Sequence, residues 1–168
     1  MTGFVVALPD RVGDFALLDS EGEFHQLSRY RYQEALVLMA FDNSCSSIGA
    51  SLAQLAQLQS EFKDKQVAFA LINSLDEVGI ESIKEIKTNL GTDFALLLDN
   101  GQLVSETIAF SKAGEIAILD PDRLTLLYRG GIDLATSEIL KQVLAGGLDE
   151  TAIKAAVGCE LDYSAKVQ

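Results

Sequence analysis

The 168-residue chain has no tryptophan, one histidine and only two cysteines. Cys45 and Cys159 lie far apart in the sequence, so with His25 they do not form the ligand spacing of a zinc or copper site. Two cysteines also cannot supply the several disulfides of a small secreted domain. The chain has no glycine-rich phosphate loop either. We therefore expect no metal or other cofactor, and a mostly reduced, cytoplasmic protein.

Basic residues are scarce as well. Thirteen Lys and Arg residues stand against 25 Asp and Glu residues, which gives a formal net charge of −12 and a pI of about 4.4. Nucleic acids and anionic membranes need a basic face, so we expect neither as a partner. The acidic residues are spread along the chain without a block of one sign, which favours a solubilising surface over a special binding site.

Long apolar runs are missing too. The longest, such as residues 35–41, have about seven residues, whereas about 20 are needed to span a bilayer. The first eight residues have neither the basic region nor the long apolar stretch of a secretory signal. We therefore expect no membrane segment and no export signal.

Apolar residues make up 48% of the chain, which is enough for one globular domain with a sizeable core. Buried strands alternate with amphipathic helices, which predicts an α/β sandwich. The Pro121 turn predicts a β-hairpin near the end, and Ser28 is a candidate cap for a short helical turn. The expected elements are a hairpin over 14–27, strands over 35–41, 67–72 and 94–98, helices over 47–62 and 78–90 and a short one ending at 108, a hairpin over 115–128, and helices over 137–144 and 149–157.

Cys45 follows the apolar strand over 35–41 and a polar turn, and it precedes a helical pattern. Backbone N–H groups and the helix dipole favour an anion at such a junction. This setting lowers the pKa of a thiol and makes it a nucleophile. The alternative is a small, buried, structural cysteine, which is common for free cysteines.

Five segments together resemble a known family. The opening segment resembles the pattern G-D-x-F-x-L-x-D-x-x-G but is one residue shorter, and Tyr128-Arg129-Gly130 fits Y-R-G. The order of these segments resembles the redoxin branch of the thioredoxin fold, which includes peroxiredoxins and alkyl hydroperoxide reductase C-like proteins. The segments are residues 12–22, 36–45, 62–74, 128–133 and 157–161.

This resemblance implies a thioredoxin-like three-layer sandwich, in which helices flank a mixed central sheet and a β-hairpin precedes it. It also implies a single domain over residues 1–168, with a core over about 12–145 and a helical tail over 146–168. The implied activity is thiol redox chemistry, and the implied nucleophile is Cys45.

The chain departs from the family pattern at several positions near Cys45. Ser46 to Ile48 follow Cys45, so the second cysteine of a C-x-x-C pair is missing. Asp42 stands where peroxiredoxins have threonine, and it would oppose ionisation of Cys45 if it pointed inward. Gly114 aligns with the expected cis-proline. The peroxiredoxin arginine that pairs with the thiolate has no equivalent at that strand start.

A cation for Cys45 must therefore come from elsewhere, because no Lys or Arg lies between Arg31 and Lys63. Arg129 is the first candidate, because it ends a strand beside the centre of the sheet and belongs to the family-like Tyr-Arg-Gly segment; Arg123 is the second. The alternative for Arg129 is a solvated hairpin end.

An oxidised Cys45 needs a second thiol for its reduction. Cys159 can supply it only if the two Cα atoms come within about 7 Å. The tail that carries Cys159 could fold back, or it could reach a second subunit and so form a homodimer. Cys159 could also be a packed terminal cysteine. The hydroxyls of Ser44, Ser46 and Ser47 are candidates for capping or for hydrogen bonds to the thiolate, whereas His25 is expected at the surface.

Two hypotheses follow. In the first, Cys45 attacks a peroxide or a disulfide, Arg129 assists, and Cys159 or an external thioredoxin- or glutathione-like thiol regenerates Cys45. In the second, the chain is a thioredoxin-fold binding or scaffold module that has lost catalysis. A fully buried Cys45 with no cation nearby would favour the second hypothesis.

Overall fold

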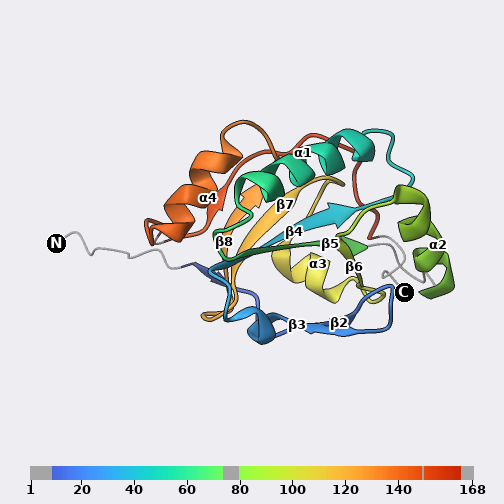
Figure 1. Ribbon diagram of the computed structural model, residues 1–168, viewed down its shortest axis with the longest axis horizontal. Helices are drawn as coiled ribbons and strands as arrows, with labels where there is room; N and C mark the ends of the chain where they lie inside the picture. Colours follow the sequence, from blue (N-terminus) through green and yellow to red (C-terminus); the bar gives the residue numbers. More distant parts are fainter. Residues whose placement is uncertain (1–8, 74–79, 149, 164–168) are drawn as a thin grey trace.

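The computed structural model describes residues 9–73, 80–148 and 150–163. The elements within these ranges follow the predicted alternation of strands and helices (Figure 1). They are β1 (Asp10–Arg11), β2 (Ala16–Leu18), β3 (Phe24–Gln26), the 3-10 helix η1 (Leu27–Tyr30), β4 (Ala35–Phe41), α1 (Ile48–Glu61), β5 (Val67–Asn73), α2 (Ile80–Leu90), β6 (Ala95–Leu98), α3 (Leu103–Ile108), β7 (Ile116–Asp120), β8 (Thr125–Gly130), α4 (Thr136–Leu144) and β9 (Ala152–Ile153).

A mixed sheet forms the centre of the described part of the chain. Its strand order is β1-β8-β7-β4-β5-β6, and β9 also pairs with β8. Strands β4, β5 and β6 run parallel, while β7 pairs antiparallel with both β4 and β8. The strands β2 and β3 form a separate antiparallel hairpin. This arrangement confirms the predicted thioredoxin-like architecture, including the N-terminal hairpin.

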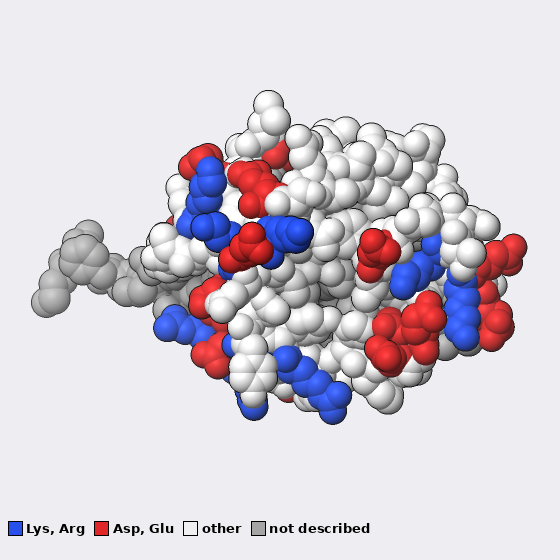
Figure 2. Space-filling model, viewed as in Figure 1, with Lys and Arg blue, Asp and Glu red and all other residues white. Residues whose placement is uncertain are grey.

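Helices cover both faces of this sheet. Figure 1 shows α1 and α4 over one face, and α3 together with the β2–β3 hairpin on the opposite side. Charged side chains on the viewed face lie in small mixed groups, and the surface over α1 is mostly uncharged (Figure 2). Among the described residues, no helix is both long and apolar enough to cross a bilayer.

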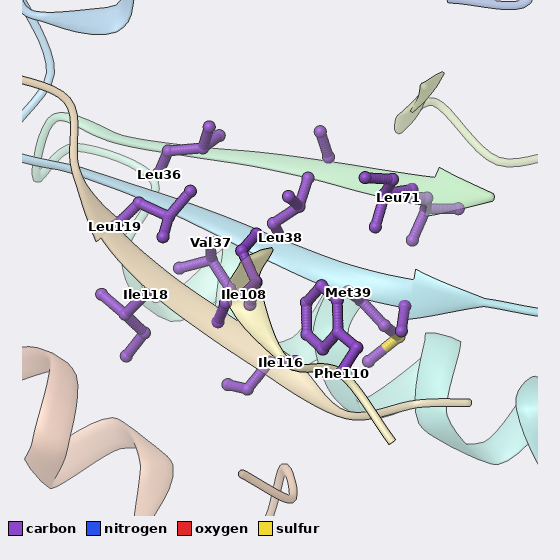
Figure 3. Packing of buried hydrophobic residues seen from close by; sticks show 14 of the residues in the cluster. Leu36, Val37, Leu38, Met39, Leu71, Ile108, Phe110, Ile116, Ile118 and Leu119 are labelled. Atoms are coloured by element: carbon purple, nitrogen blue, oxygen red, sulfur yellow. The ribbon is translucent and has the colours of Figure 1, made fainter. Parts of the chain in front are cut away.

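The core sits around β4, which lies between β5 and β7. All seven residues of β4 are buried, as expected for a strand that is covered on both faces. In Figure 3, Leu38 and Met39 project among side chains from β5, β7 and the end of α3. This packing fixes the end of β4, where the turn to Cys45 begins.

Two local predictions are wrong. The expected helix over 149–157 is not formed in residues 150–157, which contain only the short strand β9, and the predicted helical tail is likewise absent from residues 158–163. Ser28 does not cap η1; its backbone N–H and its hydroxyl both donate to the carboxylate of Asp14. The start of the second predicted helix, at Val78, lies outside the described residues.

Candidate redox site

The turn between β4 and α1 is closed by the side chain of Asp42. Its Oδ1 accepts hydrogen bonds from the backbone N–H of Ser44 at 2.9 Å and from the Ser44 hydroxyl at 2.7 Å. The backbone carbonyl of Asp42 accepts the N–H of Cys45 at 3.1 Å. Asp42 therefore acts as an Asx-turn residue, at the position where the sequence resemblance implied a threonine.

Cys45 lies at the end of this turn, three residues before the first residue of α1. Its side chain is buried, with 3% of its surface exposed. The Cys45 sulfur lies 3.2 Å from the hydroxyl oxygen of Ser47, which is the N-cap residue of α1. The Ser47 side chain makes no capping bond to the helix. Its hydroxyl contacts the sulfur, as one of the two sequence interpretations expected.

The structure joins Cys45 to Cys159 through a disulfide bond. The two Cα atoms are 5.8 Å apart, which is within the range that a disulfide requires. The tail therefore folds back onto its own chain. As whole residues, Cys159 is partly exposed, whereas Cys45 is buried.

Residues 158–163 hold Cys159 in place by lying along the segment 110–113. The backbone N–H of Ala113 donates to the carbonyl of Cys159 at 2.8 Å, and the N–H of Leu161 donates to the carbonyl of Ser111 at 3.0 Å. The hydroxyl of Tyr163 donates to the carbonyl of Phe110 at 2.8 Å. These bonds fix the path of the tail next to Cys45.

Gly114 separates this segment from β7 and lies against α1. No cis peptide bond occurs in the described ranges, and Gly114 has a φ of +88°. A Cβ atom at this position would lie 2.5 Å from the Ser51 hydroxyl, closer than real Cβ contacts come. Gly114 therefore allows both a left-handed backbone and the close approach of α1.

The Arg129 side chain contacts a carboxylate and a backbone carbonyl, and neither of these groups belongs to Cys45. Its Nε lies 3.6 Å from Oε2 of Glu115, and one of its terminal nitrogens donates to the carbonyl of Ile108 at 2.9 Å. The Glu115 side chain is buried, with 4% exposed. Arg123 lies in the hairpin turn between β7 and β8, at the opposite end of β7 from Glu115. A role for Arg129 at the thiolate stays a prediction.

His25, which the sequence placed at the surface, is partly exposed, with 17% of its side chain accessible. One ring nitrogen lies 2.6 Å from a carboxylate oxygen of Asp19, and the other lies 2.5 Å from the Tyr30 hydroxyl. Burial raises the pKa of Asp19, but hydrogen bonds from His25 and from two backbone N–H groups outweigh it, so the pKa of Asp19 is lowered. His25 thus fastens the β2–β3 hairpin to η1.

The ion pair between Arg129 and Glu115 was not predicted from the sequence. A signal for this ion pair was available in the predicted hairpin, because Arg129 pairs with Ala117 and the side chain two residues before Ala117 belongs to Glu115. Side chains two apart on a strand share a face, and diagonal neighbours lie within reach of long side chains. In the described parts of the chain, no group of three or more His, Cys, Asp or Glu residues could hold a metal ion.

Comparisons with solved structures show the same fold in other proteins. An uncharacterized conserved protein from Geobacillus kaustophilus is 25% identical, with a TM-score of 0.77 over 95% of this chain and 94% of that one. A hypothetical protein from Sinorhizobium meliloti is 23% identical, with a TM-score of 0.75 over 96% and 97% of the two chains. The peroxidoxin BcpB from Mycobacterium tuberculosis is 18% identical, with a TM-score of 0.63 over 84% and 96%.

No curated protein sequence matches the chain significantly. The sequence model of the AhpC/TSA family does match, over residues 8–121, which is more than half of the chain. The matched region includes the β2–β3 hairpin, the turn that carries Cys45, and the strands and helices up to the end of β7. The chain therefore belongs to the AhpC/TSA family.

Proposed function

We propose that this protein is a peroxide-reducing thiol enzyme in which Cys45 is the attacking thiolate and Cys159 is the resolving thiol. The family and the cysteine pair support a thiol redox function. The observation that carries the finer proposal is the disulfide between Cys45 and Cys159, because it pairs the cysteine at the family position with a second, distant thiol.

The chemistry takes three steps. The Cys45 thiolate attacks one peroxide oxygen, the O–O bond breaks, and the products are a sulfenic acid and an alcohol or water. The Cys159 thiol then attacks the Cys45 sulfur, which forms the disulfide and releases water. Finally a first external thiol attacks the Cys159 sulfur, and Cys45 leaves as a thiolate. A second external thiol, from the same dithiol or from a second monothiol, then attacks the external sulfur of this mixed disulfide; Cys159 leaves as a thiolate, and the two external thiols end as a disulfide.

Residues around the sulfur support the first step. The Ser47 hydroxyl, 3.2 Å from the Cys45 sulfur, can donate a hydrogen bond to the thiolate. The N-terminus of α1 adds its dipole, which favours an anion. Both interactions favour the thiolate, whereas the burial of Cys45 opposes its ionisation.

A thioredoxin- or glutathione-like thiol would complete the cycle, and it would attack the sulfur of Cys159, the more exposed of the two residues. A reducing, cytoplasmic setting would supply such a thiol. The sequence prediction of a homodimer belongs to this proposal only as an open alternative, since the resolving thiol already lies on the same chain.

A second candidate, the scaffold module, is favoured by two observations. Cys45 is almost completely buried, and Arg129 is engaged by Glu115. In that case the disulfide would only fasten the tail, and the reduced protein would not react with peroxide faster than free cysteine does.

The deciding experiment starts from fully reduced protein and adds one equivalent of hydrogen peroxide. Rapid loss of two free thiols and closure of the Cys45–Cys159 bond, seen by intact mass and peptide mapping, would support peroxidase chemistry. A Cys159→Ser variant should instead stop with one added oxygen on Cys45. If Cys45 is oxidised no faster than free cysteine, the peroxidase proposal is wrong and the scaffold module remains as the candidate function.

A further inference from the structure

The carboxylate of Glu115 is the centre of a buried polar network on the segment to which the Cys159 tail is hydrogen-bonded. Its Oε1 accepts the backbone N–H of Ser111 at 2.7 Å and that of Lys112 at 3.3 Å. Its Oε2 faces the Nε of Arg129 at 3.6 Å. Only 3% of Glu115 is exposed, so these contacts lie in a region of low dielectric, where they are stronger than at the surface.

The two amides that Glu115 holds belong to the segment that carries the tail. The carbonyl of Ser111 accepts the N–H of Leu161. The N–H of Ala113, two residues further on, donates to the carbonyl of Cys159. Lys112 pairs with Glu160 as an isolated antiparallel bridge, and its ammonium also lies 3.1 Å from the Glu160 carboxylate. The position of residues 111–113 therefore sets the position of Cys159.

The backbone of Glu115 is tied to the strand that leads to Cys45. The N–H of Ala40 donates to the carbonyl of Glu115 at 2.9 Å, and the N–H of Gly114 donates to the carbonyl of Ala40 at 2.8 Å. Ala40 lies in β4, five positions before Cys45. Glu115 thus connects through its main chain to β4, which leads to Cys45. Through its side chain it connects to residues 111 and 112, in the segment to which the Cys159 tail is bound.

We propose that Glu115, held by Arg129, is a positioning residue that presents Cys159 to Cys45 for disulfide closure. This inference rests on the proposed function and deepens it. It assigns Arg129 a task at the carboxylate, where the guanidinium also binds the carbonyl at the end of α3. Arg129 then acts through Glu115 and not by contact with the sulfur.

The expected effect is a change in the effective concentration of the two thiols toward each other. Holding reacting groups in the correct geometry raises this quantity by orders of magnitude. Without the Glu115 carboxylate, residues 111 and 112 lose their acceptor and Arg129 loses its counter-charge. We expect the effective concentration to fall by about 10- to 100-fold, which raises the reduction potential of the pair by about 30 mV per factor of ten.

The test is the equilibrium of the Cys45–Cys159 bond in glutathione or dithiothreitol redox buffers. Glu115→Ala should give the full loss. Glu115→Gln keeps an oxygen acceptor for the two amides, so it should restore part of the effective concentration. Arg129→Met should also lower the effective concentration of the two thiols. In the double variant with Glu115→Ala, this concentration should be scarcely lower than in Glu115→Ala alone, because the two residues act as one unit.

The control is Leu140→Ala in α4, whose side chain is fully buried in the core. It should lower the melting temperature without moving the redox equilibrium, which separates positioning from general stability. If Glu115→Ala does not fold, Glu115→Gln and Arg129→Met decide. Wild-type equilibria in these variants would overturn the inference while leaving the proposed function intact. A wild-type protein that fails to close the bond with peroxide would overturn the function itself.

Discussion

The two cysteines of the disulfide are held in very different ways. Cys45 follows a strand that is hydrogen-bonded on both sides, and the turn before it is closed by a buried carboxylate. Cys159 lies in a segment that forms no helix or strand, and a few backbone hydrogen bonds hold it. One sulfur is therefore fixed by the core, whereas the other is placed by contacts that can be removed without damage to the core.

Loss of the disulfide should give the largest effect. The bond closes a loop with a sequence separation of 114, and a loop of this size contributes up to about 4.7 kcal/mol in the chain-entropy model. We expect Cys159→Ser to lower the free energy of unfolding by about 2–4 kcal/mol, measured by urea denaturation. Hydrogen exchange should speed up more at the Ala113 and Leu161 amides than at the Ile118 amide in β7, because only the tail amides also open locally.

Equal acceleration of exchange at Ile118 in that variant would contradict the comparison. It would mean that the tail and the sheet unfold as one unit. The same protein in its reduced wild-type form is the matched control, because it lacks the bond but keeps both thiols.

A substitution at Gly158 should detach the tail without touching either cysteine. A Cβ atom at this position would lie 2.4 Å from the carbonyl oxygen of Ala113. Since this contact involves backbone on both sides, Gly158→Ala must move the tail. We expect the effective concentration of the two thiols to fall by about 100-fold in a glutathione buffer, with only a small change in the stability of the reduced protein.

Gly49→Ala is the matched control for this replacement. Gly49 is exposed on α1, and a Cβ there would meet nothing within 4 Å. Alanine favours the helix by about 1 kcal/mol over glycine, so this variant should be slightly more stable with an unchanged redox equilibrium. A Gly158→Ala protein that matches it in the redox buffer would show that Cys159 does not depend on the observed path of the tail.

The Tyr163 hydroxyl should have a smaller effect, which depends on pH. Its hydrogen bond to Phe110 is worth about 1 kcal/mol, so Tyr163→Phe should weaken tail docking by about that amount at pH 8. Burial, with the charges of Asp99, Glu106 and Glu115, raises the pKa of Tyr163 to about 12. The unfolded value is about 10.

The sign of the pH effect follows from this raised pKa. The neutral phenol is favoured in the folded state, so its contribution is complete below pH 10 and is lost as the pH rises through 12. Hydrogen exchange at the Leu161 amide should therefore show a gap between wild type and Tyr163→Phe that narrows above pH 10. A gap that stays constant up to pH 12 would mean that the hydroxyl is not buried as the structure places it.

The smallest effect is expected at the Cys45 end. Ser47→Ala removes the hydroxyl next to the sulfur but leaves the N-terminus of α1 in place. The reduced Cys45 thiol should be alkylated more slowly, because its thiolate loses a hydrogen-bond donor, and a pH series of alkylation rates measures this directly. Ser46→Ala is the control, because Ser46 is exposed on the same turn. Identical alkylation profiles for the two variants would remove Ser47 from the site.

The sequence predicted the part of the fold that is set by buried, periodic residues. The strand over 35–41, the helix after Cys45 and the hairpin at Pro121 are confirmed, because apolar runs and turn residues act locally. The helix over 149–157 is wrong for a different reason. Its alanines and charged residues favour a helix, but Ala152 pairs with Tyr128 in the sheet, and the Thr151 hydroxyl donates to the carbonyl of Leu126.

In the candidate site too, the features set by local residues could be predicted, whereas those set by distant contacts could not. The place of Cys45 could be predicted because a strand, a turn and a helix mark it in the sequence. The approach of Cys159 could be stated only as one of several alternatives, since backbone bonds to residues 111 and 113 set the path of the tail. The partner of Arg129 depends on the register of β7 against β8, which brings Glu115 within reach of the guanidinium and which a β-bulge between Ile118 and Leu119 shifts.

The span of the disulfide has a consequence for biosynthesis. Cys45 leaves the ribosome long before its partner, which is made 114 positions later. At about 5–20 residues per second, the nascent chain carries an unpaired thiol for roughly ten seconds. Until the segment that carries Cys159 has been translated and released from the exit tunnel, any oxidant or chaperone in the vicinity meets Cys45 without its disulfide partner.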